Sequence, residues 1–297
     1  MRIKFRIAAA FLCLTVFAGI SGAQPTPATQ PTLSDADKKL GEHKVVGLDY
    51  FYNHQVRNGK QFHYVWDDTA NSGYSKLGAV FEQFGASLGK LEKAPTLDDL
   101  RKFSVYIIVN PNNETKAADH KPNYIMPPDV EAISQWVKEG GVLGLFANDE
   151  KVGGCEYVHL DTLAQKFGIT FNDDVRNLVP NARDRSPGTF FAKEFPDHPL
   201  FKDVEAIYMK EICTLRVQDP AKVMVVAPKQ NGGLGNDIIM AECHYGKGLV
   251  FAVGDPWIYN EYIDVQSPGL PLENRKAAVN LARWLLGASS VPVAVQY

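Results

Sequence analysis

An apolar run that stops abruptly limits the folds open to this chain. Leu249–Val253 contains only apolar residues, and Gly254-Asp255-Pro256 follows at once. Such a run, without polar alternation, is typical of a strand buried on both faces, as in a parallel sheet covered by helices. Polar and aromatic residues then follow, among them Trp257, Tyr259, Asn260 and Glu261. Because ligands of open α/β sheets lie beyond the carboxyl ends of the strands, this pattern predicts a ligand cleft after residue 253.

Further apolar runs predict strands that alternate with amphipathic helices over the first two-thirds of the chain. The strands are expected at Lys44–Tyr50, Val105–Val109 and Val142–Phe146. Between and after them, apolar residues recur at the spacing of one buried helix face. These helices are expected at Tyr74–Phe84, Val130–Glu139 and Tyr157–Phe167. Alternation of this kind is characteristic of a parallel sheet with helices on both faces.

The last third of the chain contains mostly strands before a closing helix. Ile238–His244 is expected to form a hairpin with Leu249–Val253, because Tyr245–Gly248 has the composition of a turn. The closing helix is expected at Arg275–Leu286, with Gly287 as its cap. The predicted fold class is therefore α/β, a doubly wound and mostly parallel sheet with an antiparallel β extension.

The first 23 residues have the pattern of a secretory signal peptide. Arg2, Lys4 and Arg6 form a basic start, residues 7–20 are almost wholly apolar, and Ser21-Gly22-Ala23 supplies small residues for cleavage. Residues 24–40 begin rich in Pro and Thr and continue polar, which predicts a disordered leader. We expect an exported protein, periplasmic or extracellular, with one domain at 41–288 and a tail at 289–297.

Charge and cysteine content narrow the classes of partner. Without residues 1–23 the chain keeps 28 of its 31 basic side chains and all 34 acidic ones, a net charge of −6. An acidic chain without a basic tract is not expected to bind nucleic acid or, after signal cleavage, a membrane surface. Cys155, Cys213 and Cys243 remain, so at least one thiol is unpaired. The sequence leaves open whether any two of them form a disulfide.

Three segments together resemble the class I glutamine amidotransferase-like superfamily. They read GGVLGLFAND at 140–149, YGKGLVFAVGDPWIYNEYI at 245–263 and NRKAAVNLARWLLG at 274–287. The resemblance covers about residues 41–287 and implies a flavodoxin-like sheet. The pattern is most similar to a branch of unknown function, whose domains resemble the extra domain attached to some unsaturated rhamnogalacturonyl hydrolases. That likeness implies an association with pectin breakdown.

The catalytic cysteine of true amidotransferases is missing from this chain. In that family a Gly-x-Cys-x-Gly elbow follows the strand that corresponds to Val142–Phe146. Here residues 146–150 read Phe-Ala-Asn-Asp-Glu, without a cysteine or a framing glycine. The cysteine–histidine–glutamate chemistry of the family therefore does not transfer to this chain, and a shared fold does not supply a function. We expect no amidotransferase activity and no cofactor.

Polar and aromatic residues at four strand ends are the candidate ligand-binding set. Amide and carboxylate groups can bind sugar hydroxyls, and aromatic rings stack on sugar C–H faces. The alternative is that the Asp and Asn side chains only cap turns and helices. The candidates are Asp49, Tyr52, Asn53, His54, Asn110, Asn112, Asn148, Asp255, Trp257, Tyr259 and Asn260.

Catalytic and metal-binding arrangements are less specific in this sequence. Glycosidases use two carboxyl groups at a defined separation, and the candidates here are Asp149, Glu150, Asp255 and Glu261. A divalent metal could be held by histidines and aspartates of the 49–68 segment, which is dense in aromatic residues. The spacing of His54, His63 and the nearby aspartates matches no known ligand motif, so we expect no metal.

Three functions are compatible with these observations. The leading hypothesis is an exported protein that binds acidic pectic oligosaccharides or assists their breakdown, with a polysaccharide-degrading enzyme as a candidate partner. The first alternative is a glycoside hydrolase that acts on unsaturated rhamnogalacturonan fragments through strand-end carboxylates. The second is a structural or partner-docking module, whose cleft would be filled by its own Tyr and Trp side chains.

Overall fold

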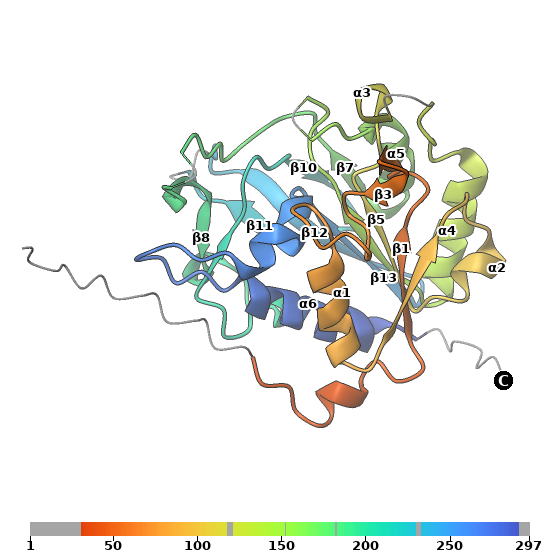
Figure 1. Ribbon diagram of the computed structural model, residues 1–297, viewed down its shortest axis with the longest axis horizontal. Coiled ribbons are helices and arrows are strands. Elements are labelled where there is room, and N and C mark those ends of the chain that lie inside the picture. Colours follow the sequence, from red (N-terminus) through yellow and green to blue (C-terminus); the bar gives the residue numbers. More distant parts are fainter. Residues whose placement is uncertain (1–30, 118–120, 152, 182, 230–232, 291–297) are drawn as a thin grey trace, which may run out of the picture.

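One sheet of nine strands forms the centre of the described part of the molecule (Figure 1). The computed structural model describes residues 31–290 apart from 118–120, 152, 182 and 230–232. Five parallel strands come first in the order β4 (Ser87–Leu91), β1 (Val45–Asp49), β5 (Val105–Val109), β6 (Val142–Phe146) and β13 (Gly248–Val253). The sheet continues through antiparallel β12 (Asp237–Tyr245), β10 (Leu215–Val217) and β7 (Ile169–Phe171), and β11 (Lys222–Ala227) also pairs with β12. The predicted fold class is confirmed.

Helices cover both faces of the sheet (Figure 1). One face carries α1 (Ser75–Gln83) and α6 (Asn274–Ala288), and the other carries α2 (Leu97–Leu100), α4 (Pro127–Glu139) and α5 (Tyr157–Ala164). The short helix α3 (Glu114–Ala117) follows the carboxyl end of β5. Two small antiparallel pairs lie outside the main sheet, β2 (Gln55–Arg57) with β3 (Lys60–Phe62) and β8 (Thr189–Phe191) with β9 (Ala206–Tyr208). Short 3₁₀ turns occupy Asp37–Lys39, Gln165–Phe167, Ser186–Gly188, Ala192–Glu194, Pro199–Phe201, Pro256–Tyr259 and Glu261–Asp264.

The apolar runs of the sequence form strands because each strand contributes to two cores. In β5, Ile107 packs into the core beneath α1 and α6, whereas its neighbours Tyr106 and Ile108 pack into the core beneath α4 and α5. In β13, Phe251 and Val250 divide in the same way. Successive side chains of a strand point to opposite faces, so a strand covered by helices on both sides must be apolar throughout.

The ends of several elements differ from the prediction. The hairpin between β12 and β13 is confirmed, and so are the strands β5 and β6 at the predicted bounds. The helix expected at Tyr157–Phe167 is α-helical only to Ala164 and ends in a 3₁₀ turn. The expected cap at Gly287 is wrong, because α6 continues through it to Ala288. Nothing lies within 4 Å of a Cβ built at Gly287, so the helix needs no glycine there.

The structure begins within the predicted leader. The predicted signal peptide, leader residues 24–30 and tail residues 291–297 lie outside the described residues. Asp37 accepts a hydrogen bond from the Arg283 guanidinium of α6 at 2.7 Å, and the Gly41 N–H donates to the Phe84 carbonyl at 2.7 Å. The segment just before Gly41 is therefore attached to the domain. No helix in the described ranges is both long and apolar enough to pass through a membrane.

Candidate functional site

The carboxyl ends of β1, β5 and β6 meet in a buried cluster of asparagine side chains. The Asn53 side-chain amide donates to the Asn110 carbonyl oxygen at 2.8 Å. Asn110 Oδ1 accepts the Asn148 backbone N–H at 2.9 Å, and Asn110 Nδ2 donates to the Gly153 carbonyl oxygen at 2.9 Å. All three asparagines are at most 1% exposed. The structure thus brings these predicted ligand residues together, but beneath the surface and bonded to backbone groups. We call Asn53, Asn110, Asn148 and Gly153 the asparagine cluster.

Asp49, the last residue of β1, holds the loop that follows it. Its carboxylate accepts the backbone N–H groups of Tyr52 and Asn53, each at 3.0 Å, and the Tyr106 hydroxyl at 3.1 Å. Burial raises the pKa of Asp49 to about 6, although these hydrogen bonds oppose the rise. Tyr52 is fully buried. Both predicted ligand residues therefore lie under the loop and do not face solvent.

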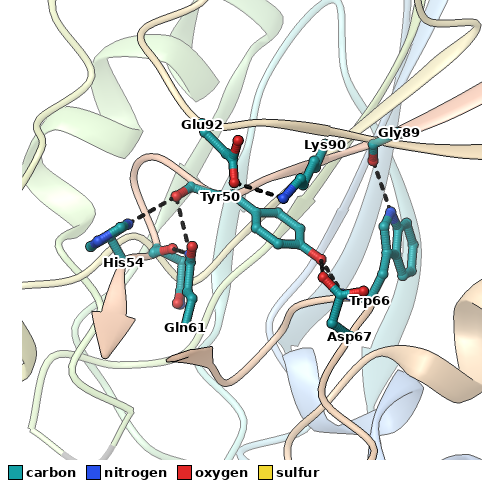
Figure 2. A network of polar contacts seen from close by, with 9 residues as sticks. Tyr50, His54, Gln61, Trp66, Asp67, Gly89, Lys90 and Glu92 are labelled. Atoms are coloured by element: carbon teal, nitrogen blue, oxygen red, sulfur yellow. Dashed lines mark hydrogen bonds and ion pairs between the residues drawn. The ribbon is translucent and has the colours of Figure 1, made fainter. Parts of the chain in front are cut away.

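A second network fixes the segment between β1 and α1 (Figure 2). The Tyr50 carbonyl oxygen lies 3.2 Å from His54 Nδ1 and accepts the Gln61 side-chain amide at 3.0 Å. The Tyr50 hydroxyl accepts the Trp66 backbone N–H at 2.7 Å, so Tyr50 contacts the segment at both Gln61 and Trp66. The His54 backbone N–H donates to Asn112 Oδ1 at 2.7 Å. His54 and Asn112 thus connect the loops after β1 and β5.

The loop after β13 turns Asp255 inward and Trp257 toward the surface. Asp255 is fully buried, and its carboxylate accepts the Trp257 N–H at 2.8 Å and the Lys210 backbone N–H at 3.1 Å. Burial raises the pKa of Asp255 to about 7. Trp257 is partly exposed, and its indole N–H donates to the Tyr64 hydroxyl at 2.6 Å. The predicted ligand residues Tyr259 and Asn260 are fully buried.

A pocket of about 590 Å³ lies over the asparagine cluster. It joins the β2–β3 hairpin, the 63–72 loop, α3 and Trp257, and Gly153 belongs both to its lining and to the cluster beneath. We call it the basic pocket, because its described lining includes Arg57 and Lys116 and no carboxylate. The lining residues are Gln55, Arg57, His63, Tyr64, Ala70, Asn71, Ser72, Lys116, Gly153 and Trp257.

The two cations of the basic pocket pack against neighbouring residues, Arg57 through its guanidinium and Lys116 through its stem. The Arg57 guanidinium lies 4.0 Å from the centre of the Phe62 ring across the hairpin. The Lys116 stem runs so close to Gly154 that a Cβ there would lie 2.3 Å from Lys116 Cγ. A third cation, Lys210, lies outside the lining with its Nζ 4.7 Å from the centre of the Trp257 ring. The indole therefore has a cation close to its ring, and Arg57 and Lys116 line the same pocket as the indole.

The 63–72 loop has an unusual backbone. His63, Tyr64 and Ser72 have φ angles of 60°, 46° and 70°, in the left-handed region that residues with a Cβ seldom adopt. The Tyr64 N–H donates to the Ser72 carbonyl at 2.8 Å, and the His63 N–H donates to Asp68 at 3.1 Å, which holds the strained segment. Strained residues often gather at functional sites, and these three all line the basic pocket.

The imidazole of His63 has a lower pKa than an ordinary histidine. Burial lowers its pKa to about 4, and the neighbouring charges of Lys116 and Arg57 act in the same direction, whereas Asp68 opposes them. His63 is therefore neutral at neutral pH. Sequence reasoning considered His63 as a metal ligand or a packing group, and it missed Arg57 and Lys116. The aromatic and histidine-rich composition of residues 61–66 was the available signal for this loop.

Asp149, Glu150 and Asp255, the candidate acids whose side chains are described, do not line the basic pocket. Asp149 is 1% exposed and accepts the Gly153 backbone N–H at 3.3 Å, so it supports the pocket floor from behind. Glu150 is exposed, and its backbone N–H donates to Asp173 at 3.2 Å. The Glu261 side chain lies outside the described residues. Asp255 is buried beneath the loop after β13. The described lining of the basic pocket therefore holds no pair of these acids.

Cysteines and metal ligands offer no further centre in the described part of the chain. Cys155, Cys213 and Cys243 are buried thiols and do not pair with one another. Burial raises the pKa of Cys155 and Cys213 well above the usual thiol value, so neither resembles an activated nucleophile. Within the residues that can be described, no group of three His, Cys, Asp or Glu side chains is arranged to hold a metal ion.

Comparison with known proteins identifies a fold. No family model matches the sequence, and no curated protein matches it. The chain is similar to the mmIFT52 N-terminal domain, with a TM-score of 0.62 and 15% identity over 82% of this chain and 97% of that one. It is also similar to the cytoplasmic protein STM1381 from Salmonella typhimurium LT2, with a TM-score of 0.50 and 12% identity over 83% and 100%. At such identities the similarity concerns the fold alone. The chain has a flavodoxin-like α/β fold with a mostly parallel central sheet.

Proposed function

We propose that this protein is exported and binds acidic oligosaccharides of the pectic type in the basic pocket, without amidotransferase activity. The observation that carries the proposal is the composition of the described lining, which has two cations, an indole and no carboxylate. This lining contrasts with the net charge of −3 of the whole chain. A polysaccharide-degrading enzyme is the partner that would supply or consume such ligands.

The chemistry of an acidic sugar matches the groups around the basic pocket. A guanidinium can bind a carboxylate through two parallel hydrogen bonds, and Lys116 adds a second cation nearby. The Trp257 indole offers a flat apolar surface for the C–H face of a sugar ring. Gln55 and Asn71 supply amides for hydroxyl groups. The volume of about 590 Å³ is within the range of about 300–1,000 Å³ of small-ligand pockets.

The alternatives have weaker support. A glycoside hydrolase needs two carboxyl groups on either side of a bound sugar. Asp149 and Asp255 instead lie behind the described lining, where they accept the backbone N–H groups of the lining residues Gly153 and Trp257. A docking module was expected to have its cleft filled by aromatic side chains. Tyr64 and Trp257 instead form part of a wall around an open volume. The signal-peptide pattern favours export, and the family resemblance favours a plant polysaccharide as the source of the ligand.

Calorimetry with matched ligands tests the proposal. We expect the protein to bind a galacturonate tetrasaccharide, and to bind the same tetrasaccharide with methyl-esterified carboxyl groups at least about tenfold more weakly, a difference of about 1.4 kcal/mol. Affinity for the acid form should fall as salt is added, because exposed charges are screened. Equal affinity for the acid and the ester, or no binding of either by the folded protein, would contradict the proposal.

Charge-removing variants locate the binding site. Arg57→Gln and Lys116→Gln should each weaken binding of the acid by about tenfold and leave binding of the ester nearly unchanged. Trp257→Ala should weaken both ligands alike, because it removes the stacking surface. Lys166→Gln is the matched control, since Lys166 is exposed on a 3₁₀ turn and does not line the basic pocket. An equal loss of affinity in Lys166→Gln would place binding elsewhere.

A further inference from the structure

Two neighbouring side chains with complementary chemistry face the same pocket. His63 and Tyr64 both line the basic pocket, and their ring centres lie 6.0 Å apart. In an extended chain, successive side chains point to opposite sides. The left-handed backbone of both residues departs from that geometry and accompanies their shared position. A neutral imidazole can take up a proton, and a phenol can donate one, so the pair has the two groups of acid–base catalysis.

The surrounding charges would stabilise the intermediate of such a reaction. Removal of a proton from the carbon beside a carboxylate builds negative charge on the carboxylate oxygens. Arg57 and Lys116 line the same pocket and carry the positive charge that this intermediate needs. The Tyr64 hydroxyl already accepts the Trp257 indole N–H at 2.6 Å, a bond that also stabilises the phenolate left after proton donation.

We propose that the basic pocket cleaves its acidic ligand by β-elimination at a 4-linked hexuronate, with His63 as the base and Tyr64 as the acid. The inference rests on the proposed binding function and extends it to a reaction. Arg57 and Lys116 bind the carboxylate and stabilise its charge, and Trp257 orients the sugar ring.

Each bond and proton in this step is accounted for. His63 removes the proton from C5, and the electron pair of the C5–H bond forms the C4=C5 double bond. The C4–O4 bond breaks, and O4 leaves with the proton of the Tyr64 hydroxyl. The products are a shortened sugar with a free hydroxyl and a 4,5-unsaturated uronate. After release, the proton passes from His63 to Tyr64 through solvent, so neither an oxidant nor a second substrate is consumed.

The charges around His63 link binding to its basicity. In the free protein burial holds the His63 pKa below its ordinary value of 6.5, the charges of Lys116 and Arg57 lower it further, and Asp68 opposes them. A bound carboxylate compensates the two cations and therefore raises the basicity of the imidazole when substrate is present. We expect the acid limb of kcat/KM to lie below that of kcat, because the first reports the free enzyme and the second the complex.

The test separates binding from reaction. The near-ultraviolet absorbance of the conjugated uronate is followed with galacturonate tetrasaccharide, and calorimetry is run on the same samples. His63→Asn is the informative variant, because asparagine tolerates the left-handed backbone at this position. It should lower the rate about 100-fold or more and change Kd less than about threefold. Tyr64→Phe should lower the rate similarly. His244→Asn, at an exposed residue of β12, should keep both.

The outcomes are distinguishable. Binding without any absorbance change by the wild-type protein would overturn the β-elimination and leave the proposed function intact. Formation of unsaturated product at the same rate in His63→Asn would also overturn the inference, since the base would then be another group. Absence of binding by the folded wild-type protein would remove the proposed function and the inference together.

Discussion

Two layers of polar residues lie at the same edge of the sheet and have different roles. The asparagine cluster at the strand ends is buried, and its side chains bind backbone groups of neighbouring loops. The basic pocket above it is built by the β2–β3 hairpin, the 63–72 loop, α3 and Trp257. Gly153 belongs to both layers. The difference teaches that the strand-end side chains fix the loops by hydrogen bonds, whereas side chains of the loops line the pocket.

The reason for this division is the long segment between β1 and α1. It covers residues 50–74, includes the β2–β3 hairpin and lies over the strand ends. Buried polar groups need hydrogen-bond partners. The nearest partners for the strand-end side chains are backbone groups of this segment and of the loop after β6. Arg57 and His63 belong to the same segment and line the basic pocket.

The largest expected effect is the loss of Asn110. Asn110→Ala removes two buried hydrogen bonds and places alanine at a φ of 46°, so we expect about 4 kcal/mol less free energy of unfolding in urea titrations. Asn110→Gly separates the two causes, because glycine adopts this backbone without strain. Asn71→Ala, at an exposed residue of the pocket lining, should change stability by less than about 0.5 kcal/mol. A weaker ligand affinity in Asn110→Ala without loss of stability would break the division into two layers.

The next effect concerns the pH dependence of stability. The pKa of Asp255 is 3.8 in its ordinary state and about 7 in the folded protein. Between these pH values the Asp255 carboxyl keeps its proton in the folded state and has lost it in the unfolded state. The contribution of Asp255 to the free energy of unfolding therefore falls as pH rises from about 4 to 7. Asp255→Asn stays neutral, and its stability relative to wild type should improve over this range by on the order of 2–3 kcal/mol.

Urea titrations at several pH values measure this change. Asp49 and Asp161, whose pKa values burial raises to about 6, leave a residual slope of the same sign in the variant. Asp35→Asn, at a side chain that is 95% exposed, is the control and should leave the slope as in wild type. If the free energy of unfolding depends on pH in the same way in Asp255→Asn and Asp35→Asn, the pKa of Asp255 is not raised by folding and the prediction is wrong.

The smallest pair of effects compares two glycines. In Gly153→Ala the new Cβ would lie 2.4 Å from Asn148 Cβ, so we expect a loss of about 1–3 kcal/mol and weaker ligand binding from a displaced pocket floor. In Gly287→Ala the new Cβ meets nothing within 4 Å, and the helix α6 should gain about 0.5–1 kcal/mol. Thermal unfolding and calorimetry measure both. A Gly153→Ala protein with unchanged stability and affinity would show that the two layers do not share this residue.

Much of the fold could be predicted because its signals are local. The apolar runs of β5, β6 and β13 and the helical spacing in α1 and α4 are visible without any partner. Element ends were less certain, as the passage of α6 through Gly287 shows. Glycine favours a helix end only where the backbone must turn left-handed, and that requirement depends on the path of the chain after the helix.

The sequence alone determined the buried parallel strands, the lack of a cysteine at residues 146–150 and the polar residues that follow β1, β5, β6 and β13. Periodicity and residue type suffice for these, because each is a property of neighbouring residues. Only the tertiary structure decided that Asn110 and Asp255 turn inward and that Arg57, Lys116 and Trp257 line one pocket. Residues 57 and 257 come together through the paths of loops over the packed sheet, and no local pattern encodes those paths.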